Sequence, residues 1–173
     1  WGVYNVTEKQ RKKYLGSSPF DWIGSRSDLP FNMAMYDLMG KFLEMPAWKL
    51  IGERVRQRIP VSAWTVSQTP EMMAQEVKHA AALGYTWLKY HIDEVQNVVD
   101  QTRAMQAVAP PGFRIHYDIT GGGSADHMPD LLEKLAQYPI AGCFEDPLDD
   151  GDIQGAIELR QRIKLPILRH RAP

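Results

Sequence analysis

Two carboxylates, Asp118 and Glu145, each stand at the end of a short apolar segment of this chain. Residues 124–138 between them carry apolar side chains at helical spacing, a pattern that predicts a strand, a helix and a second, parallel strand. Parallel strands joined in this way end at the same edge of a sheet. Carboxylates at one edge repel each other unless a cation joins them, and Mg²⁺ binds carboxylate oxygens. The pair therefore predicts a divalent-metal site.

Further ionisable side chains occur at or near the ends of the neighbouring predicted strands. They are Lys89, His91, Arg114, His116, Asp146, Arg169, His170 and Arg171. Lys89 and His91 are two residues apart, which puts them on the same face of a strand. So many charges at successive strand ends are costly to bury unless a metal or a substrate neutralises them. This concentration is the main indication of function.

The elements that hold these residues alternate regularly after Arg58. Strands are predicted over 59–66, 85–92, 113–118, 141–145 and 165–170, and helices over 72–83, 95–108, 124–138 and 152–163. Repeated units of one strand and one helix predict an α/β fold with a parallel sheet. No dinucleotide-binding glycine motif follows the first strand. The pattern therefore favours an incomplete (β/α) TIM-type barrel of about five strands and four helices over a Rossmann sheet.

Residues 1–57 lack this alternation and are predicted to be irregular to helical. Asp28 and Pro30 are typical of the N-cap and first turn of a helix, which Pro46 ends. Trp1 is not an initiator methionine, and the predicted fifth strand lies close to the last residue. We therefore expect a chain cut at both ends, with a first region over 1–57 and, over 58–173, a barrel truncated after its fifth strand.

The composition is that of an ordinary globular protein. Of the 173 residues, 44% are hydrophobic and 24% charged, and the net charge of −1 gives no sign of binding to nucleic acid or to an anionic membrane. No segment is long and apolar enough to span a membrane. The single cysteine, Cys143, excludes an internal disulfide and indicates a reducing, cytoplasmic location.

Several short motifs, in consistent order over roughly residues 20–173, resemble the enolase superfamily in its mandelate racemase and muconate lactonizing enzyme branch. They read M-A-M-Y-D-L-M-G-K-F-L-E-M-P-A-W-K-L-I-G, I-P-V-S-A, L-K-Y-H, Y-D-I-T and F-E-D-P. The resemblance implies that residues 1–57 are the C-terminal part of a capping domain with its linking helices, and that 58–173 begin a modified (β/α)7β barrel. It also implies Mg²⁺ held by carboxylates ending the third, fourth and fifth strands. Asp118 and Glu145 match the first two.

The same resemblance implies abstraction of the proton α to a substrate carboxylate, through an enediolate intermediate. The base of the family is usually the second lysine of a Lys-x-Lys motif, and here that motif reads Lys89-Tyr90-His91. Lys89 and His91 are therefore the candidate catalytic residues, because histidine also serves as a general acid or base near neutral pH. A purely structural role for His91 remains the alternative.

The fifth strand departs from the family pattern, since Arg169-His170-Arg171 stands where an acid is expected. If His170 is the third ligand, its imidazole favours Mn²⁺, Zn²⁺ or Fe²⁺. If Arg171 takes that place, its guanidinium opposes a metal and binds a carboxylate directly. The residues expected to bind substrate or support the ligands are Arg114, His116, Asp146, Arg169 and Arg171.

The expected function is that of a metal-dependent lyase or isomerase. Dehydration of a sugar acid is favoured over racemisation, epimerisation or cycloisomerisation, with a small-molecule carboxylate as substrate and a homo-oligomer as the expected assembly. A non-catalytic relative that binds a carboxylate ligand is the alternative. The 173-residue chain by itself is expected to be inactive, because the later strands supply the second acid/base group of the family.

Overall fold

The computed structural model describes residues 7–22, 29–92, 97–119, 127–149 and 151–170. The chain divides into two compact units, residues 1–59 and 60–173. None of the helices in these described ranges is both long and apolar enough to cross a membrane.

The first unit is helical. It contains α1 (Glu8–Tyr14), the 3-10 helix η1 (Pro19–Trp22), α2 (Leu29–Phe42) and α3 (Trp48–Ile51). The buried ring of Tyr14 stacks on Phe31 at a centroid distance of 4.3 Å and meets Trp22 edge-on at 4.8 Å. Asp28, the predicted N-cap of α2, lies outside the described residues. The unit is therefore held by aromatic contacts between its helices.

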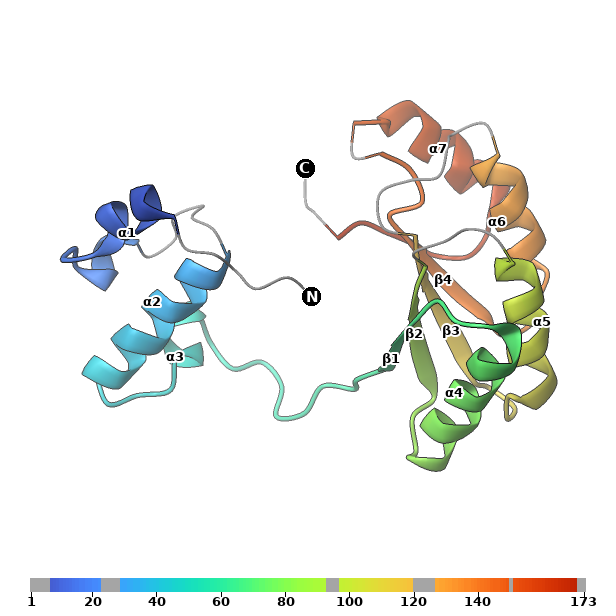
Figure 1. Cartoon of the computed structure of the whole chain (residues 1–173), viewed down its shortest axis with the longest axis horizontal. Helices are drawn as coiled ribbons and strands as arrows, with labels where there is room; N and C mark the ends of the chain where they lie inside the picture. Colours follow the sequence, from blue (N-terminus) through green and yellow to red (C-terminus); the bar gives the residue numbers. More distant parts are fainter. Residues whose placement is uncertain (1–6, 23–28, 93–96, 120–126, 150, 171–173) are drawn as a thin grey trace. The chain divides into compact units, whose positions relative to one another are not determined.

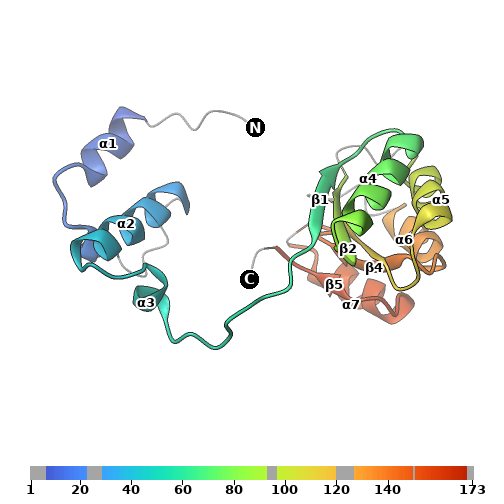
Figure 2. The ribbon, with the colours of Figure 1, turned by 90° about the horizontal axis from the view of Figure 1, so that it is seen from below.

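The second unit is a parallel five-stranded sheet covered by helices on one face (Figure 1). Its strands are β1 (Ala63–Val66), β2 (Trp87–His91), β3 (Arg114–Asp118), β4 (Ala141–Glu145) and β5 (Ile167–Leu168), paired in chain order. The helices between them are α4 (Pro70–Ala82), α5 (Val98–Val108), α6 (Met128–Ala136) and α7 (Ile153–Arg162). Figure 2 shows α4, α5 and α6 side by side on the same side of the strands. The predicted α/β fold of parallel β/α units is confirmed.

β4 has its predicted bounds and α4 begins two residues earlier than predicted, but several other elements are shorter. β1 begins at Ala63 rather than Ile59, because its pairing with β2 starts only at Ala63 and Leu88. β5 comprises only two residues, which pair with Phe144 and Glu145. α5 begins at Val98, after Asn97 in a left-handed conformation with φ 67°. The parts of two predicted helices over 95–96 and 124–126 lie outside the described residues.

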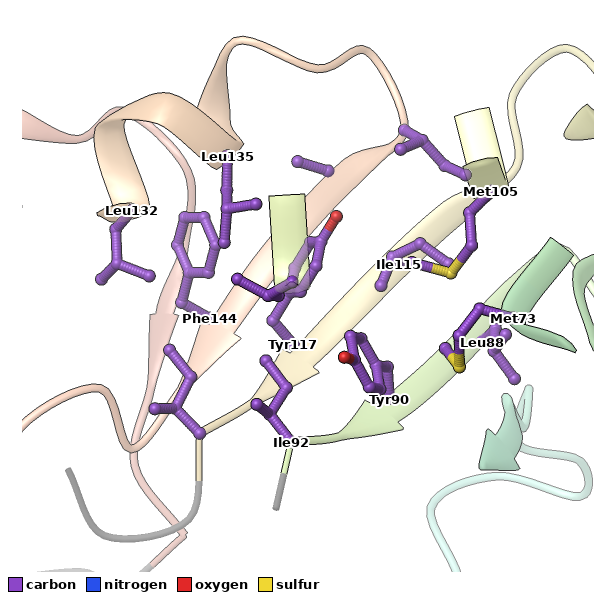
Figure 3. Close-up of a cluster of buried hydrophobic side chains, with 14 of the residues drawn as sticks. Met73, Leu88, Tyr90, Ile92, Met105, Ile115, Tyr117, Leu132, Leu135 and Phe144 are labelled. Carbon is purple, nitrogen blue, oxygen red and sulfur yellow. The ribbon is translucent and has the colours of Figure 1, made fainter. Parts of the chain in front are cut away.

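The core lies between the sheet and helices α4 to α7. Alternate strand residues point into it, and the largest are Leu88, Tyr90, Ile115, Tyr117 and Phe144, each at most 1% exposed. Figure 3 shows these side chains together with Met105 of α5 and Leu132 and Leu135 of α6. The rings of Tyr90, Tyr117 and Phe144 follow one another at 6.0 and 5.5 Å, so one aromatic row joins three strands.

A bulge in β4 sets the register between β3 and β4. Ile115 pairs with Ala141, but His116 pairs with Cys143, which leaves Gly142 as an extra residue. The Trp87 ring packs against Gly142, where a Cβ atom would lie 2.4 Å from the ring. The bulge aligns Glu145 with Asp118, so both side chains emerge on the sheet face opposite the helices.

Candidate functional site

The sheet face opposite helices α4 to α7 is polar toward the carboxyl ends of its strands. We call it the polar face, and its residues at those ends are Lys89, His91, His116, Asp118, Cys143 and Glu145. They alternate with the core residues along β2, β3 and β4, because successive side chains of a strand point to opposite faces. Three strands thus deliver their ionisable groups to one edge of the sheet.

The two carboxylates of this face converge on one ammonium group. Lys89 Nζ lies 2.8 Å from Asp118 Oδ2 and 2.6 Å from Glu145 Oε2. Asp118 is 5% exposed and Glu145 is 6% exposed, so neither charge is well hydrated. The two carboxylates share the single positive charge of Lys89, which makes this triad the electrostatic centre of the site.

The pKa values of the triad follow from this competition between burial and pairing. Burial lowers the pKa of Lys89, but hydrogen bonds to Asp118 and Glu145 and their negative charges outweigh it, so the pKa is raised. Burial and the charge of Asp118 raise the pKa of Glu145, but the hydrogen bond from Lys89, the charge of Lys89 and the hydrogen bond to His170 together outweigh them, so the pKa is lowered. Both groups are therefore held in their charged forms at neutral pH.

Two imidazoles approach Glu145, one on each oxygen. His116 Nε2 lies 2.6 Å from Oε2 but outside the angles of a hydrogen bond, and it is a buried atom with no hydrogen-bond partner within the described ranges. His170 Nδ1 lies 3.1 Å from Oε1 and is within hydrogen-bond geometry. Burial lowers the pKa of His116 more than the charge of Glu145 raises it, so its imidazole is held neutral.

His91 lies at the end of β2 beside Asp118. Its Nε2 is 4.0 Å from Asp118 Oδ2, and its side chain is 27% exposed. The Trp64 ring of β1 lies 6.2 Å from the imidazole. His91 is therefore both close to the carboxylates and open to a small molecule.

Asp146 follows β4 in a left-handed conformation, with φ 46°. Its Oδ1 accepts a hydrogen bond of 2.9 Å from the backbone N–H of His170. Ligand atoms of Glu145, Asp146 and His170 lie within 4.8 Å of one another, a spacing that suits a metal ion. The hydrogen bond to Asp146 thus holds the residue that follows β5, His170, close to Glu145.

The donor set fits a divalent cation. Two buried carboxylates already share one positive charge at Lys89, and the acidic and imidazole donors of Glu145, Asp146 and His170 lie together next to it. Oxygen and imidazole donors of this kind bind divalent ions of the Mg²⁺ to Zn²⁺ range.

Two of the three arginines expected near the site, Arg114 and Arg169, hydrogen-bond to backbone carbonyls. Arg114 stands at the opposite end of β3 from Asp118 and donates to the carbonyl of Phe113 at 3.2 Å. Arg169 donates to the carbonyl of Asp149 at 3.3 Å and lines a cavity of about 180 Å³ beside α7. Arg171 lies outside the described residues. The exposed His79 and His127 lie on α4 and at the start of α6.

A buried polar network behind β2 was not expected from the sequence. The amide of Gln101, which is 3% exposed, donates to the carbonyl of Gln68 and to Ser67 Oγ and accepts from the Tyr90 hydroxyl. Ser67 N in turn donates to the carbonyl of His91 at 2.9 Å. Gln101 and Thr102 are polar residues on the sheet-facing side of α5, where an apolar stripe is expected. This departure is the sequence signal that could have indicated the buried network.

Parallel strands paired in chain order, with helices on one face and polar side chains at their carboxyl ends, are typical of β/α-barrel proteins, whose sites lie at those ends. The sequence profile of the family described as enolase C-terminal domain-like matches residues 72–170, more than half of the chain. This chain therefore belongs to the enolase C-terminal domain-like family, in the mandelate racemase and muconate lactonizing enzyme branch.

Three similar proteins illustrate the family. The N-succinyl-L-Arg/Lys racemase of Bacillus cereus is 28% identical over 140 residues, 79% of this chain and 37% of the racemase. The D-galactonate dehydratase of Xanthomonas oryzae pv. oryzae is 30% identical over 76 residues, 44% of this chain and 20% of the dehydratase. A mandelate racemase/muconate lactonizing protein from Paracoccus denitrificans, solved in complex with magnesium, is 22% identical with a TM-score of 0.65, over 79% of this chain and 39% of that one. The chain thus spans well under half the length of these relatives.

Proposed function

We propose that this chain provides the first catalytic groups of an enzyme that removes the proton α to a carboxylate with the help of a divalent cation. The observation that carries the proposal is the convergence of Asp118 and Glu145, both buried, on Lys89 Nζ at the carboxyl edge of the sheet. Such a concentration of compensated charge is typical of an active site. Residues 1–57 are then the end of a capping domain.

Asp118 and Glu145 would hold the cation, Mg²⁺ or Mn²⁺, with His170 as a third donor. When bound, the cation supplies positive charge for the negative charge that develops on the substrate carboxylate. The cation competes with Lys89 Nζ for the same two carboxylates. Its binding is therefore expected to release the ammonium group for contact with the substrate.

His91 and Lys89 would handle the proton. His91 shares the polar face with the triad and is open enough to reach a substrate carbon, and a neutral imidazole accepts a proton near neutral pH. Lys89, once the cation has replaced it at the two carboxylates, would orient the substrate carboxylate with its ammonium group and return a proton. The two side chains point the same way from β2, so they act on one side of the substrate.

The substrate is proposed to be a small carboxylate, and dehydration of a sugar acid is the favoured reaction. One similar protein is a D-galactonate dehydratase and another an N-succinyl-L-Arg/Lys racemase. Dehydration and racemisation begin with loss of the same α-proton. A homo-oligomer in the cytoplasm is the proposed setting.

Exchange of the α-proton with solvent tests the function directly. The protein as naturally produced is incubated in D₂O with Mg²⁺ or Mn²⁺ and a panel of sugar acids and N-acylated amino acids, and deuterium uptake is followed by NMR. We expect exchange with at least one acid, and its loss by a factor of about 10² or more in His91→Asn. The exposed His79→Asn serves as the matched control and is expected to exchange normally. Absence of exchange across the panel, with cation binding demonstrated, would refute the proposal.

A second function is favoured by one observation, the contact of both carboxylates with the ammonium group of Lys89. A site whose negative charge is partly neutralised by its own lysine is consistent with a protein that binds a carboxylate ligand without turning it over. Calorimetric titration with Mg²⁺ and Mn²⁺ separates the two functions. If neither ion binds, the non-catalytic alternative is favoured, because the enzyme requires a cation.

A further inference from the structure

Trp64 of β1 is a large apolar residue on the polar face. It pairs with Lys89 of β2, and paired residues of neighbouring parallel strands point to the same face of the sheet. Its neighbours in β1 point the other way, since Ala63 packs against the core and Thr65 is buried. The Trp64 side chain itself is 46% exposed. An open apolar surface therefore lies among ionisable groups.

The indole ring lies beside the proposed base. Its centroid is 6.2 Å from that of the His91 ring, and the two ring planes are inclined by 48°. The side chains of Lys89 and His91 are themselves 22% and 27% exposed. A small molecule that contacts His91 from the polar face can thus also contact the ring of Trp64.

A second tryptophan on the same face shows what a packing role looks like. Trp87 stands two residues before Lys89, at the amino end of β2, and its ring packs against Gly142 in the space that a side chain there would need. Trp87 is 37% exposed, which is similar to Trp64. Trp64, however, lies at the level of Lys89 and next to the imidazole of His91. Its position is that of a residue in contact with a ligand.

We propose that Trp64 is a specificity-determining residue that stacks against the carbon chain of a polyhydroxy acid whose carboxylate is bound on the polar face. The inference rests on the proposed function, which supplies the binding site of that carboxylate. The electron-rich face of an indole attracts weakly positive C–H groups and shields them from water. A sugar acid carries C–H groups along its chain and hydroxyl groups that bond to polar residues, so it suits a mixed surface of this kind.

The alternative occupant is a cationic side chain, such as that of an N-acylated arginine, because cations also bind to the face of an indole. Lys89 places a positive charge on the strand beside Trp64. Like charges brought together at a binding site are unfavourable, whereas a neutral polyhydroxy chain meets no such repulsion. The surroundings of Trp64 therefore favour the sugar acid.

The experiment measures selectivity among acids rather than turnover. The protein as naturally produced is titrated in Mg²⁺ with a panel of six-carbon sugar acids that includes D-galactonate, with D-glycerate and with N-succinyl-L-arginine. Binding is followed by calorimetry and by the NMR signals of the tryptophan indole N–H groups. D-glycerate has the same 2-hydroxy carboxylate on a shorter chain. We expect the best sugar acid to bind at least about tenfold more tightly than D-glycerate.

Trp64→Leu removes the stacking surface and is expected to reduce this ratio about tenfold, with little change in the affinity for D-glycerate. Trp64→Phe keeps an aromatic ring and is expected to keep most of the ratio. Trp87→Leu is the matched control, because it removes a tryptophan of similar exposure from the same face. It is expected to leave the ratio unchanged, even if it lowers the stability of the protein.

The unmodified protein keeps the test decisive if Trp64→Leu fails to fold. The sugar acid should shift the indole N–H signal of Trp64, which Trp64→Phe assigns, and leave that of Trp87 in place. An unshifted Trp64 signal, an unchanged ratio in the folded variants, equal affinity for D-glycerate, or a preference for N-succinyl-L-arginine would overturn the inference and leave the proposed function intact. Binding of none of the acids would instead overturn the proposed function.

Discussion

The two faces of the second unit's sheet are made by the same strands but are stabilised in different ways. On the helix-covered face, Leu88, Tyr90, Ile115, Tyr117 and Phe144 are excluded from water almost completely. On the polar face, the charge of Lys89 partly compensates the charges of Asp118 and Glu145. Successive residues of one strand therefore have different roles: one packs in the core, and the next points to the face that could bind a cation and substrate.

The difference implies different consequences of mutation. Apolar burial contributes to the free energy of unfolding in proportion to the buried area, whatever lies on the other face. Buried charges contribute little net stability, but they become costly when one partner is removed. Substitutions should thus separate into those that lower stability and those that change pH dependence and cation binding.

Phe144→Ala is expected to have the largest effect on stability. The ring is fully buried and packs 5.5 Å from Tyr117, so its removal leaves a cavity and costs about 3–5 kcal/mol of unfolding free energy. Urea denaturation measures the change. Met72→Ala on the exposed side of α4 is the control, at about 0.5 kcal/mol or less. A small loss for Phe144→Ala would show that the helix-covered face is not the main source of stability.

Lys89→Met is expected to destabilise the protein by about 1–3 kcal/mol at neutral pH, because two buried carboxylates then lack their common partner. The Lys89 side chain is 22% exposed, so solvent reduces the loss below that of a fully buried pair.

The pH dependence of the Lys89→Met effect follows from the carboxylates. Lys89 lowers the pKa of Glu145, so the stability it adds is present above the ordinary glutamate pKa of about 4.3 and is lost as the pH falls through the lower folded value. The melting temperatures of Lys89→Met and the unmodified protein should therefore converge in acid. Lys78→Met, at an exposed position of α4, is the control. A difference that persists undiminished at low pH would contradict the compensation argument.

Gln101→Leu tests a polar connection on the helix-covered face. The leucine leaves the carbonyl of Gln68 and the hydroxyl of Tyr90 without this partner, and we expect a loss of about 1–2 kcal/mol. Ser67 N bonds the carbonyl of His91, so the NMR signals of the His91 ring should shift as well. Gln75→Leu on the exposed side of α4 is the control. Unchanged His91 signals would mean that the two faces are independent here.

The reactivity of the Cys143 thiol measures how far water and small reagents penetrate the polar face. It is the prediction with the smallest expected effect on the protein. Cys143 is 6% exposed, and burial raises the pKa of its thiol to about 11. At pH 8 only roughly 0.1% is thiolate, the reactive form. A thiol reagent is therefore expected to modify the native protein slowly and the guanidinium-unfolded protein fast. Rapid modification of the native protein would show that solvent and small reagents reach Cys143 on the polar face.

The kind of fold and the residues at the strand ends could be predicted from the sequence. Short apolar segments predict the strands, and segments with helical periodicity predict the helices between them. Thr69 and Pro70 predict the start of α4, as its N-cap and first residue. These are local signals, since they depend on the periodicity and capping of neighbouring residues. The exact starts of β1 and α5 could not be predicted, because they depend on partner strands and on the left-handed residue Asn97.

The contacts between the strand-end residues could not be predicted from the sequence, because they depend on how the strands pair. Lys89 and Glu145 are 56 positions apart, and no local pattern indicates that one ammonium joins Glu145 to Asp118. The bulge at Gly142 sets Glu145 opposite Asp118, and the orphaned Nε2 of His116 is visible only once that register exists. Distances across a sheet depend on strand register, which pairing and packing fix and sequence spacing does not.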